Sequence, residues 1–483
     1  MTLEFGTAGI RATMGNAEDQ LNVQNVKKFA LAIANIEKYQ KIVIGYDTRN
    51  HSKEFAQTIA DVLTDQKFNK TVFISNHYTQ TPLLSYAVKY YEADCGIMIT
   101  ASHNPKNYNG IKVYDKNGVQ LLPDDTIKIK ENMNDNSIIY QQLTNQKHTL
   151  HYILDDCMRS YINQASQIAN NVLRESRYNI MLTSFHGTSR PILTRLLENL
   201  NFNQFIWDEQ TSNVDPNFSN IQTANPEKEN AFYQFVQKAV NLNCSLIIGT
   251  DPDSDRLGLV ELYKDGSYRF FTANEIAMIL LYLRANDVQS KSTVITSHVT
   301  SESFKELCQR LNLNLIQTSV GFKFIANEIQ HIKDDFLFAY EESHGFLFDS
   351  FVGDKDAIQC IPMIIQYKTD LERVNRTFYD LLFVIKESLD DYKDQTLSID
   401  VNRDKIDEVM NHLETYHKAN ICQLTIQKYI IDHKNNYVEI ITDKGHIIVR
   451  PSGTEPKIKI YFSLCVDDLN QCINQFLEFL NLE

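Results

Sequence analysis

Three aspartates occupy alternate positions in one short segment of the chain, at Asp251, Asp253 and Asp255. Alternate residues of an extended segment point to the same side, so we expect the three carboxylates to converge. A divalent cation would relieve their repulsion, and Mg²⁺ suits a site that a substrate phosphate completes. An EF-hand is excluded, because Arg256 and Leu262 stand where that loop needs a glycine and a bidentate glutamate. A solvated acidic turn remains the alternative.

A second loop, TASHNP at residues 100–105, follows an apolar segment of strand length at 97–99. Its small polar residues and closing proline predict a tight exposed turn, in which Ser102 is a candidate nucleophile. His103 is next to it, but adjacent side chains often diverge, so the spacing does not assign His103 as the base. The absence of a G-x-S-x-G motif disfavours acyl chemistry. The alternative is an ordinary turn with a capping serine.

Two further loops carry polar groups that could bind a ligand. Residues 450–457, RPSGTEPK, combine an arginine, a glycine and two hydroxyls, which suit a phosphate. The chain has neither GxxxxGK nor GxGxxG, so ATP and NAD are not expected. Residues 341–345, EESHG, follow an apolar segment and offer acceptors for sugar hydroxyls. An incidental hairpin and a polar strand end are the alternatives. The four loops together predict phosphoryl transfer between a serine and a phosphorylated sugar or polyol.

The elements around these loops alternate between strand and helix. Residues 41–46 read as a buried strand, and residues 55–63 have a helical period. Such alternation predicts βαβ units with mixed or parallel sheets. The pattern restarts near residues 179 and 294, and the segments 42–49 and 246–256 resemble each other. The sequence therefore predicts three related α/β domains.

The C-terminal part of the chain has closely spaced strand candidates and a final helix over residues 469–480, which predicts a smaller α+β domain. The polar stretch 128–151 is the best linker candidate. We predict four domains, with boundaries near residues 150, 265 and 385. Their ranges are 1–150 with the serine loop, 151–265 with the metal loop, 266–385 with the sugar loop and 386–483 with the phosphate loop.

Length and composition restrict the class of protein. The 483 residues are 43% apolar and 22% charged, which suits about three to four globular domains of roughly 150 residues. The formal net charge of −14 disfavours nucleic acid as a partner. The longest apolar run, 276–283, is far shorter than the ~20 residues that span a bilayer, and we expect no signal peptide or membrane anchor. Eight cysteines without a C-x-x-C pair are expected to be reduced thiols in the cytosol.

These residues resemble the signature loops of the α-D-phosphohexomutases. The resemblance rests on TASHNP, DPDSDR at 251–256, EES and RPSGTEPK in this order. FGTAGIRA at 5–12 and NGIKVY at 109–114 also match. Four other segments are most similar to the bacterial phosphoglucomutase or phosphomannomutase branch related to phosphopentomutase-like enzymes: HGTS at 186–189, TANPE at 223–227, VGFK at 320–323 and DKDA at 354–357.

The resemblance implies four domains around a central cleft. It implies interconversion of hexose 1-phosphate and hexose 6-phosphate, with glucose and/or mannose as the sugar, through a phosphoserine and a sugar bisphosphate. Ser102 matches the phosphoserine, and its phosphate would hold Mg²⁺ together with Asp251, Asp253 and Asp255. Glucose 1,6-bisphosphate, or the matching sugar bisphosphate, is the implied activator. The implied partners are small sugar phosphates, with no nucleic acid and no membrane, and the chain would be a monomer or homodimer.

The remaining roles also follow from the resemblance. Glu341 and Ser343 would bind sugar hydroxyls, and the non-transferring phosphate would meet Arg450, Ser452, Gly453 and Thr454. The catalytic set would comprise Ser102, His103, Arg11 and Lys112, with Lys112 a candidate proton shuttle. Arg256 and Lys355 match further cationic positions.

Two departures from the family bear on substrate choice. The order EESHG, instead of E-x-S-G-H, argues against glucosamine phosphate, and residues 350–353 lack a histidine and an arginine that some relatives have. The main alternative is a phosphopentomutase acting on ribose or deoxyribose 1-phosphate. A catalytically silent sugar-phosphate sensor is disfavoured because the matched catalytic positions are intact. A phosphatase is disfavoured because a closed site excludes water.

Overall fold

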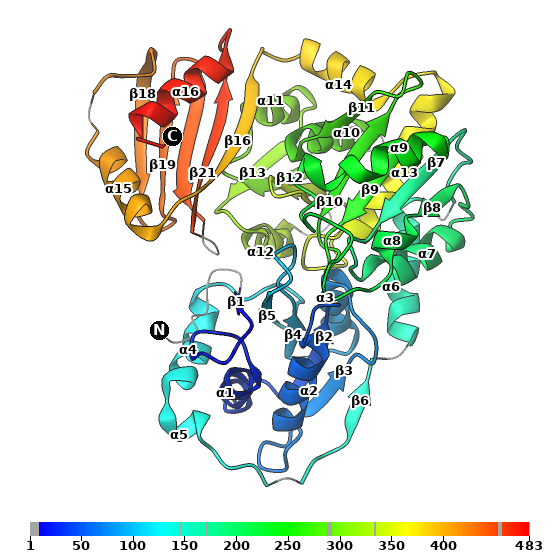
Figure 1. Cartoon of the computed structure of the whole chain (residues 1–483), viewed down its shortest axis with the longest axis vertical. Coiled ribbons are helices and arrows are strands. Elements are labelled where there is room, and N and C mark those ends of the chain that lie inside the picture. The colour runs from blue at the N-terminus through cyan, green and yellow to red at the C-terminus, as the bar shows by residue number, and fades with distance from the viewer. Residues whose placement is uncertain are drawn as a thin grey trace.

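The structure is a computed structural model that describes residues 9–144, 146–153, 155–170, 172–286, 292–332, 335–416, 418–452 and 456–482. Four parts follow one another along the chain, each built on its own sheet. In Figure 1 the N-terminal part, in blue and cyan, lies below the green and yellow parts, and the orange and red C-terminal part lies at upper left. No helix in the described ranges is long and apolar enough to cross a membrane.

Domain I has a six-stranded sheet whose centre is parallel. Its strand order is β1 (Ile10–Thr13), β5 (Tyr108–Tyr114), β4 (Cys95–Ile99), β2 (Lys41–Tyr46), β3 (Thr71–Ile74) and β6 (Leu150–Tyr152). Only β5 runs in the opposite direction, antiparallel to β4 on one side and to β1 on the other. The helices are α1 (Val23–Ala34), α2 (Ser52–Leu63), α3 (Thr81–Tyr90), η1 (Asp124–Thr126), α4 (Ile127–Asn134) and α5 (Asn136–Ile139).

Both faces of this sheet are buried, which explains why its central strands are apolar throughout. Ile42 and Ile44 of β2 belong to the core beneath α1 and α2. Val43, between them, belongs to a second core together with Leu84 of α3. That second core continues through domains II and III, so the first three domains share apolar packing.

Domain II repeats this architecture. Its strand order is β11 (Tyr268–Phe271), β10 (Leu257–Leu262), β9 (Cys244–Thr250), β7 (Asn179–Thr183) and β8 (Phe205–Trp207). Its helices are α6 (Asp155–Ile168), α7 (Ser189–Asn199), α8 (Glu209–Ser212), η2 (Glu229–Ala231) and α9 (Tyr233–Asn241).

Domain III repeats the architecture of domains I and II with a smaller sheet. The order is β13 (Asn314–Thr318), β12 (Thr293–Ser297), β14 (Phe336–Glu341) and β15 (Gly345–Leu347). The helices are α10 (Ala273–Ala285), α11 (Glu302–Arg310), α12 (Phe322–Ile332), α13 (Ala357–Arg373) and α14 (Phe378–Glu387). A capping box of Thr272 and Glu275 begins α10, and Asp356 caps α13.

The three repeats place their functional loops at one equivalent connection. The repeated unit has four strands: β2 to β5 in domain I, where the edge strands β1 and β6 are additional, β7 to β10 in domain II and β12 to β15 in domain III. In each unit the first strand is central, the second and third are parallel to it on either side, and the fourth is antiparallel to the third. The turns from third to fourth strand are β4 to β5, β9 to β10 and β14 to β15. These turns carry the predicted serine, metal and sugar loops, at the carboxyl ends of the third strands, where ligands bind in α/β sheets. The predicted three related α/β units are therefore confirmed.

Domain IV has a sheet in which each neighbouring pair of strands is antiparallel. The order is β16 (Lys393–Asp400), β21 (Lys457–Leu464), β20 (Gly445–Pro451), β19 (Tyr437–Thr442), β18 (Leu424–Asp432) and β17 (Asn420–Ile421). The helices α15 (Arg403–Glu414) and α16 (Leu469–Phe479) share its core. A small apolar cluster of Val299, Ile448 and Tyr461 joins it to domain III. The smaller α+β domain with a final helix is confirmed.

Two details of the predicted organisation are wrong. The stretch 128–151 is not simply a linker, because it forms α4 and α5 and ends in β6, which pairs with β3. Ile129 and Met133, one helical turn apart, pack on the domain I core. The residues between them are polar, so the helical spacing of the two apolar residues was not recognised in the sequence. The similarity of segments 42–49 and 246–256 does not relate equivalent strands, since β2 is the first strand of its repeated unit and β9 is the third strand of its own. The exact domain boundaries stay a prediction.

Candidate active site

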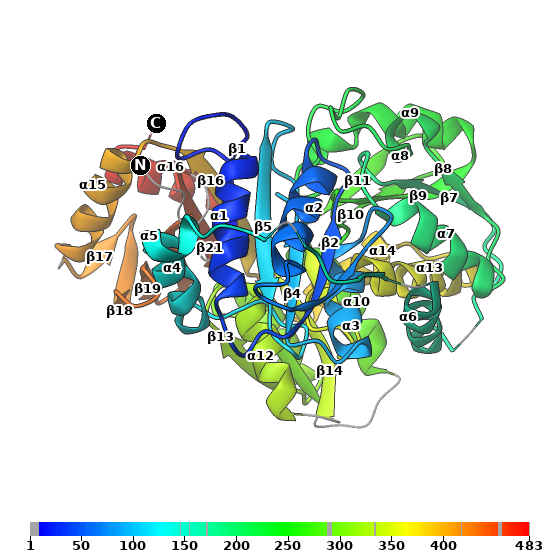
Figure 2. The ribbon, with the colours of Figure 1, turned by 90° about the horizontal axis from the view of Figure 1, so that it is seen from below.

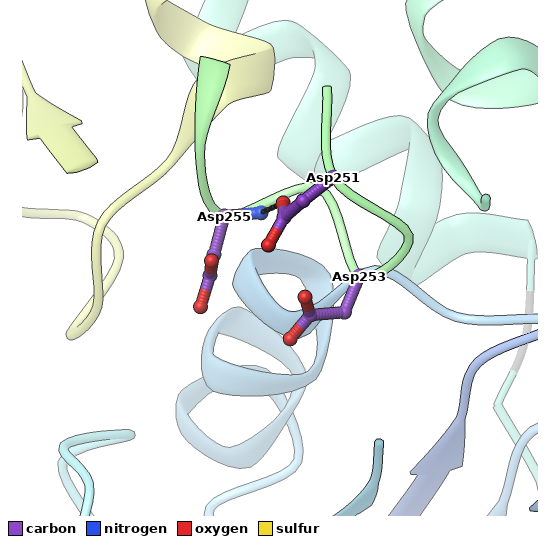
Figure 3. Close-up of side chains that lie close together, drawn as sticks. All are labelled: Asp251, Asp253 and Asp255. Carbon is purple, nitrogen blue, oxygen red and sulfur yellow. Dashed lines mark hydrogen bonds between the residues drawn. The ribbon is translucent and has the colours of Figure 1, made fainter. Parts of the chain in front are cut away.

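The metal loop between β9 and β10 brings three carboxylates together. One oxygen each of Asp251, Asp253 and Asp255 lies within 4.8 Å of the others, and all three side chains are buried. Figure 3 shows them converging from one turn of the chain. The sequence predicted an extended segment here, and this prediction is wrong. Ser254 has a left-handed φ of 63°, and its N–H donates to Asp251 O at 3.0 Å. A tight turn produces the convergence instead.

Cations from two other domains contact these carboxylates. Lys112 Nζ of β5 donates to Asp253 Oδ2 at 2.8 Å and to Asp255 Oδ2 at 2.9 Å. Lys355 Nζ lies 3.0 Å from Asp255 Oδ2. Burial opposes the charge of Asp255, but Lys112, Lys355 and Arg256 outweigh it and hold the pKa of this carboxyl well below its usual range. Burial and the neighbouring Asp253 and Asp255 raise the pKa of Asp251.

The donor set fits a hard divalent cation. Among the described residues, the buried oxygens Asp253 Oδ1 and Asp255 Oδ1 have no hydrogen-bond partner. Unpaired buried carboxylate oxygens are costly, and an oxygen-binding cation such as Mg²⁺ would satisfy them. Asp251 Oδ1 is already occupied, since it accepts the N–H groups of Asp255 and Arg256 at 3.1 and 3.0 Å. Its other oxygen, Oδ2, is the one that faces the serine loop.

Ser102 meets the metal loop directly. Its Oγ donates to Asp251 Oδ2 at 2.7 Å, and its backbone has a left-handed φ of 51°. Its N–H donates to Thr100 Oγ1 at 2.8 Å, which stabilises this turn. The candidate nucleophile and the candidate metal cluster therefore form one site, although they come from different domains.

Arg49, at the carboxyl end of β2, organises the serine loop, and sequence reasoning missed it. Its guanidinium is fully buried and lies 3.3 Å from Asp47 through Nε. It donates to four backbone carbonyls at 2.5 to 3.0 Å, those of Ser102, Asn104, Pro105 and Tyr108. The signal in the sequence was an arginine after a buried strand, where ligand-binding residues gather. Arg11 of β1 also reaches this loop, because its Nη1 donates to Asn104 Oδ1 at 2.9 Å.

His103 is the histidine of this loop. Its Nδ1 is buried without a hydrogen-bond partner among the described residues. Burial and then the charge of Arg256 hold its pKa well below the usual range, so the imidazole is neutral at neutral pH. Arg256 itself forms an ion pair with Glu227, a residue of the TANPE segment that sequence reasoning did not single out.

The third loop lies on domain III between β14 and β15. Glu341 and Ser343 line the cleft, and Ser343 Oγ is buried without a partner among the described residues. Glu342, which the sequence did not single out, accepts from Ser297 Oγ at 2.8 Å and Thr300 Oγ1 at 2.6 Å. Burial raises its pKa to about 7. Glu342 thus ties the loop to the carboxyl end of β12.

The phosphate loop forms the turn between β20 and β21. Arg450 Nε donates to Tyr461 Oη at 3.2 Å, and the Ser452 N–H donates to Lys457 O at 2.8 Å. Gly453 and Thr454, which were predicted to bind phosphate, lie outside the described residues.

One cleft of about 680 Å³ connects these loops. Residues of all four domains line it, including Arg11, His103, Lys112, Arg256, Glu341, Ser343, Lys355, Arg450 and Ser452. Ser102 and the three aspartates are no more than 1% exposed, so the prediction of an exposed turn is wrong at Ser102 itself. Lys457 and Lys459 of β21 add positive charge on the domain IV side. Such a cleft, with separated cationic groups and hydroxyl-binding groups between them, suits a sugar that carries phosphate.

Comparison with known proteins supports this interpretation. The chain matches four models for phosphoglucomutase/phosphomannomutase: alpha/beta/alpha domain I over residues 2–138, domain II over 159–264, domain III over 272–382 and the C-terminal domain over 400–469. A phosphoglucomutase from Staphylococcus saprophyticus is 37% identical over 516 aligned residues, which cover 98% of this chain and 92% of that protein.

Solved structures have the same fold. A phosphoglucomutase/phosphomannomutase family protein from Burkholderia thailandensis has a TM-score of 0.76 at 17% identity, covering 99% of this chain and 96% of its own. An N-acetylphosphoglucosamine mutase from Aspergillus fumigatus, solved with glucose 1,6-bisphosphate, has a TM-score of 0.56 at 13% identity, covering 100% and 95%. With all four domain models matched in order and a full-length relative above one third identity, the chain belongs to the phosphoglucomutase/phosphomannomutase family of α-D-phosphohexomutases.

Proposed function

We propose that this chain is a phosphohexomutase that interconverts hexose 1-phosphate and hexose 6-phosphate of glucose and/or mannose. The observation that carries the proposal is the 2.7 Å hydrogen bond from Ser102 Oγ to the buried aspartate cluster, beside a cleft that four domains line. A phosphopentomutase is not favoured, because the matched full-length relative is a phosphoglucomutase.

In this proposal Ser102 carries the phosphoryl group in the resting active enzyme. The bond from Ser102 Oγ to phosphorus breaks as a substrate hydroxyl oxygen binds the phosphorus, and the hydroxyl proton goes to a base. The sugar then carries two phosphates and turns over in the cleft. The reverse transfer takes the other phosphate to Ser102 Oγ, so that the phosphoenzyme is restored and no water is consumed.

Mg²⁺, when bound by Asp251, Asp253, Asp255 and the Ser102 phosphate, would supply charge neutralisation for the phosphoryl group. Lys112, Lys355 and Arg11 add protein charges from domains I and III near the same group. In phosphoryl transfer, such positioning and electrostatic stabilisation provide most of the catalysis.

Two protein groups are placed to handle the substrate proton. The carboxylates of Asp253 and Asp255 outweigh burial and raise the pKa of Lys112, so its Nζ holds its proton and can return it to a leaving oxygen. His103 is neutral and faces the cleft, so its imidazole can accept a proton. We propose both as members of the proton path.

The rest of the cleft would hold the non-reacting parts of the sugar. Glu341 and Ser343 would accept and donate hydrogen bonds to ring hydroxyls. Arg450 and Ser452, together with Gly453 and Thr454, would bind the distal phosphate, and Arg256 adds a further cation. Holding the phosphate that does not react positions the one that does.

Initial rates on a panel of sugar phosphates test the proposal. With Mg²⁺ and a catalytic amount of glucose 1,6-bisphosphate, we expect turnover of glucose 1-phosphate or mannose 1-phosphate to exceed that of glucosamine 1-phosphate and ribose 1-phosphate. Faster turnover of ribose 1-phosphate would establish the pentomutase instead. Release of inorganic phosphate in place of an isomer would show a phosphatase, and the absence of turnover on every sugar would leave only binding.

A further inference from the structure

Strand β5 of domain I carries two side chains that contact two other domains. Lys112 and Tyr114 of β5 are alternate residues and therefore share one face of the strand. Lys112 reaches the metal loop of domain II. Tyr114, which is fully buried, donates its hydroxyl to Asp354 Oδ2 of domain III at 2.9 Å.

Asp354 precedes Lys355 and fixes its conformation. Asp354 Oδ1 accepts the backbone N–H of Lys355 at 2.9 Å and lies 3.4 Å from Lys355 Nζ. The aliphatic part of Lys355 lies on the backbone of Gly345, where a Cβ would come within 2.2 Å of Lys355 Cδ. The lysine is therefore held from two sides while its Nζ reaches Asp255 at 3.0 Å.

Domain I also holds the backbone that leads to Lys355. Ser85 Oγ of α3 accepts the N–H of Gly353 at 2.9 Å. Lys89 Nζ, one helical turn later, donates to the carbonyls of Ser350 and Phe351 at 3.2 and 2.9 Å. A Cβ at Gly353 would lie 2.5 Å from Gly118 O, so the two backbones are in close contact. This loop of domain III is thus fastened to the same domain that carries Ser102.

We propose that Tyr114 is a positioning residue for phosphoryl transfer: its hydroxyl holds Asp354, and through Asp354 it holds Lys355 against the metal loop. A phenylalanine would fill the same apolar space, but it would leave the buried carboxylate without this donor. The inference rests on the proposed function, because it gives Lys355 a place beside the transferring phosphoryl group.

Steady-state kinetics of Tyr114→Phe test the inference, with glucose 1-phosphate, Mg²⁺ and glucose 1,6-bisphosphate. We expect kcat to fall about 10-fold, because a misplaced electrostatic contact in a closed site slows the reaction, and KM to change less than about threefold. In a Lys355→Met background the same substitution should add less than about twofold, because it acts through the lysine.

Tyr161→Phe is the matched control. Tyr161 is also a buried tyrosine whose hydroxyl donates to an aspartate of this loop, at 2.7 Å to Asp356 Oδ2. Asp356 accepts the N–H groups that begin α13 and makes no contact with Lys355 Nζ that the structure records among the described residues. We expect Tyr161→Phe to lower Tm about as much as Tyr114→Phe while kcat stays within about twofold.

Three results would overturn the inference: full kcat in Tyr114→Phe, an equal loss in the Lys355→Met background, or an equal loss in Tyr161→Phe. If Tyr114→Phe does not fold, Asp354→Asn replaces it in both backgrounds, because it changes the group that accepts from the Tyr114 hydroxyl and that lies next to Lys355 Nζ. A wild-type chain without turnover would refute the proposed function itself, whereas active wild type with a normal Tyr114→Phe would refute only the role of Tyr114.

Discussion

Ser102 and Asp251 are 149 residues apart in the chain, and yet the serine Oγ donates a 2.7 Å hydrogen bond to the aspartate Oδ2. The two residues occupy equivalent turns in two repeats of the same fold, each between a third strand and its antiparallel neighbour. Domain repetition thus provides both halves of the candidate active site, and packing of domain I on domain II brings them together.

Ser102→Ala should abolish mutase activity. In the proposed mechanism, the substitution removes the oxygen that accepts the phosphoryl group. Intact-mass spectrometry of the active wild-type protein should show one phosphate, and peptide mapping should locate it on Ser102. Activity above a few per cent in the alanine variant would refute the assignment of the nucleophile.

Asp253→Asn should raise the Mg²⁺ concentration needed for half-maximal rate. The variant keeps the shape of the cluster but removes one charge, and kcat should fall about 100-fold or more, as for the loss of one electrostatic contact in a closed site. The control is Asp265→Asn in an exposed turn of the same domain, whose carboxylate accepts from Ser267. An Mg²⁺ titration identical to that of the wild type would place the metal elsewhere.

Arg450→Ala should weaken binding of the phosphate that does not react. A charge-assisted hydrogen bond to phosphate contributes about 1.5–3 kcal/mol, so kcat/KM should fall roughly 10- to 200-fold. Arg450→Lys should restore part of this loss, because it returns the charge without the planar fork. Ser102 should still become phosphorylated, only more slowly.

Arg403→Ala is the control for this variant, because Arg403 is exposed on α15 of the same domain. We expect its kcat/KM to match the wild type. If Arg450→Ala matched the wild type as well on every sugar phosphate, the turn between β20 and β21 would have a structural role only.

Arg49→Met should destabilise domain I strongly. The variant leaves Asp47 without its buried partner and four loop carbonyls without their donor. Removing one member of a buried ion pair costs about 3–5 kcal/mol of unfolding free energy, which chemical denaturation would measure. Arg190→Met, which breaks an exposed pair with Glu209, should cost no more than about 1 kcal/mol. Equal losses in the two variants would contradict the role given to Arg49.

Glu342 should make stability depend on pH. Burial raises its pKa from 4.5 to about 7 in the folded chain, so the unfolded chain loses this proton at lower pH than the folded chain does. The unfolding free energy should therefore decrease as pH rises from 4.5 to about 7, by no more than about 3 kcal/mol from this group. In Glu342→Gln the decrease should be smaller. Parallel denaturation profiles of variant and wild type between these pH values would contradict the prediction.

The sequence alone identified the loops, because the residues of each loop are neighbours in the chain. The alternate aspartates at 251, 253 and 255, the serine of TASHNP and the arginine of RPSGTEPK are local patterns that need no knowledge of the fold. Strand and helix periods likewise predicted the repeated α/β domains, since burial on both faces of a sheet leaves long apolar strands.

Only the tertiary structure decided which of these groups meet. Lys112 and Lys355 come from different domains to one aspartate cluster, and no spacing in the sequence relates them to Asp255. Arg49 donates to backbone carbonyls, which every residue has. The types of its partner residues therefore cannot reveal these contacts in the sequence. The turn at Ser254, where an extended segment was predicted, likewise depends on backbone hydrogen bonds within the packed loop. Residues that are neighbours in the chain thus determine the chemistry of each loop, whereas the packing of the domains determines which distant charges pair.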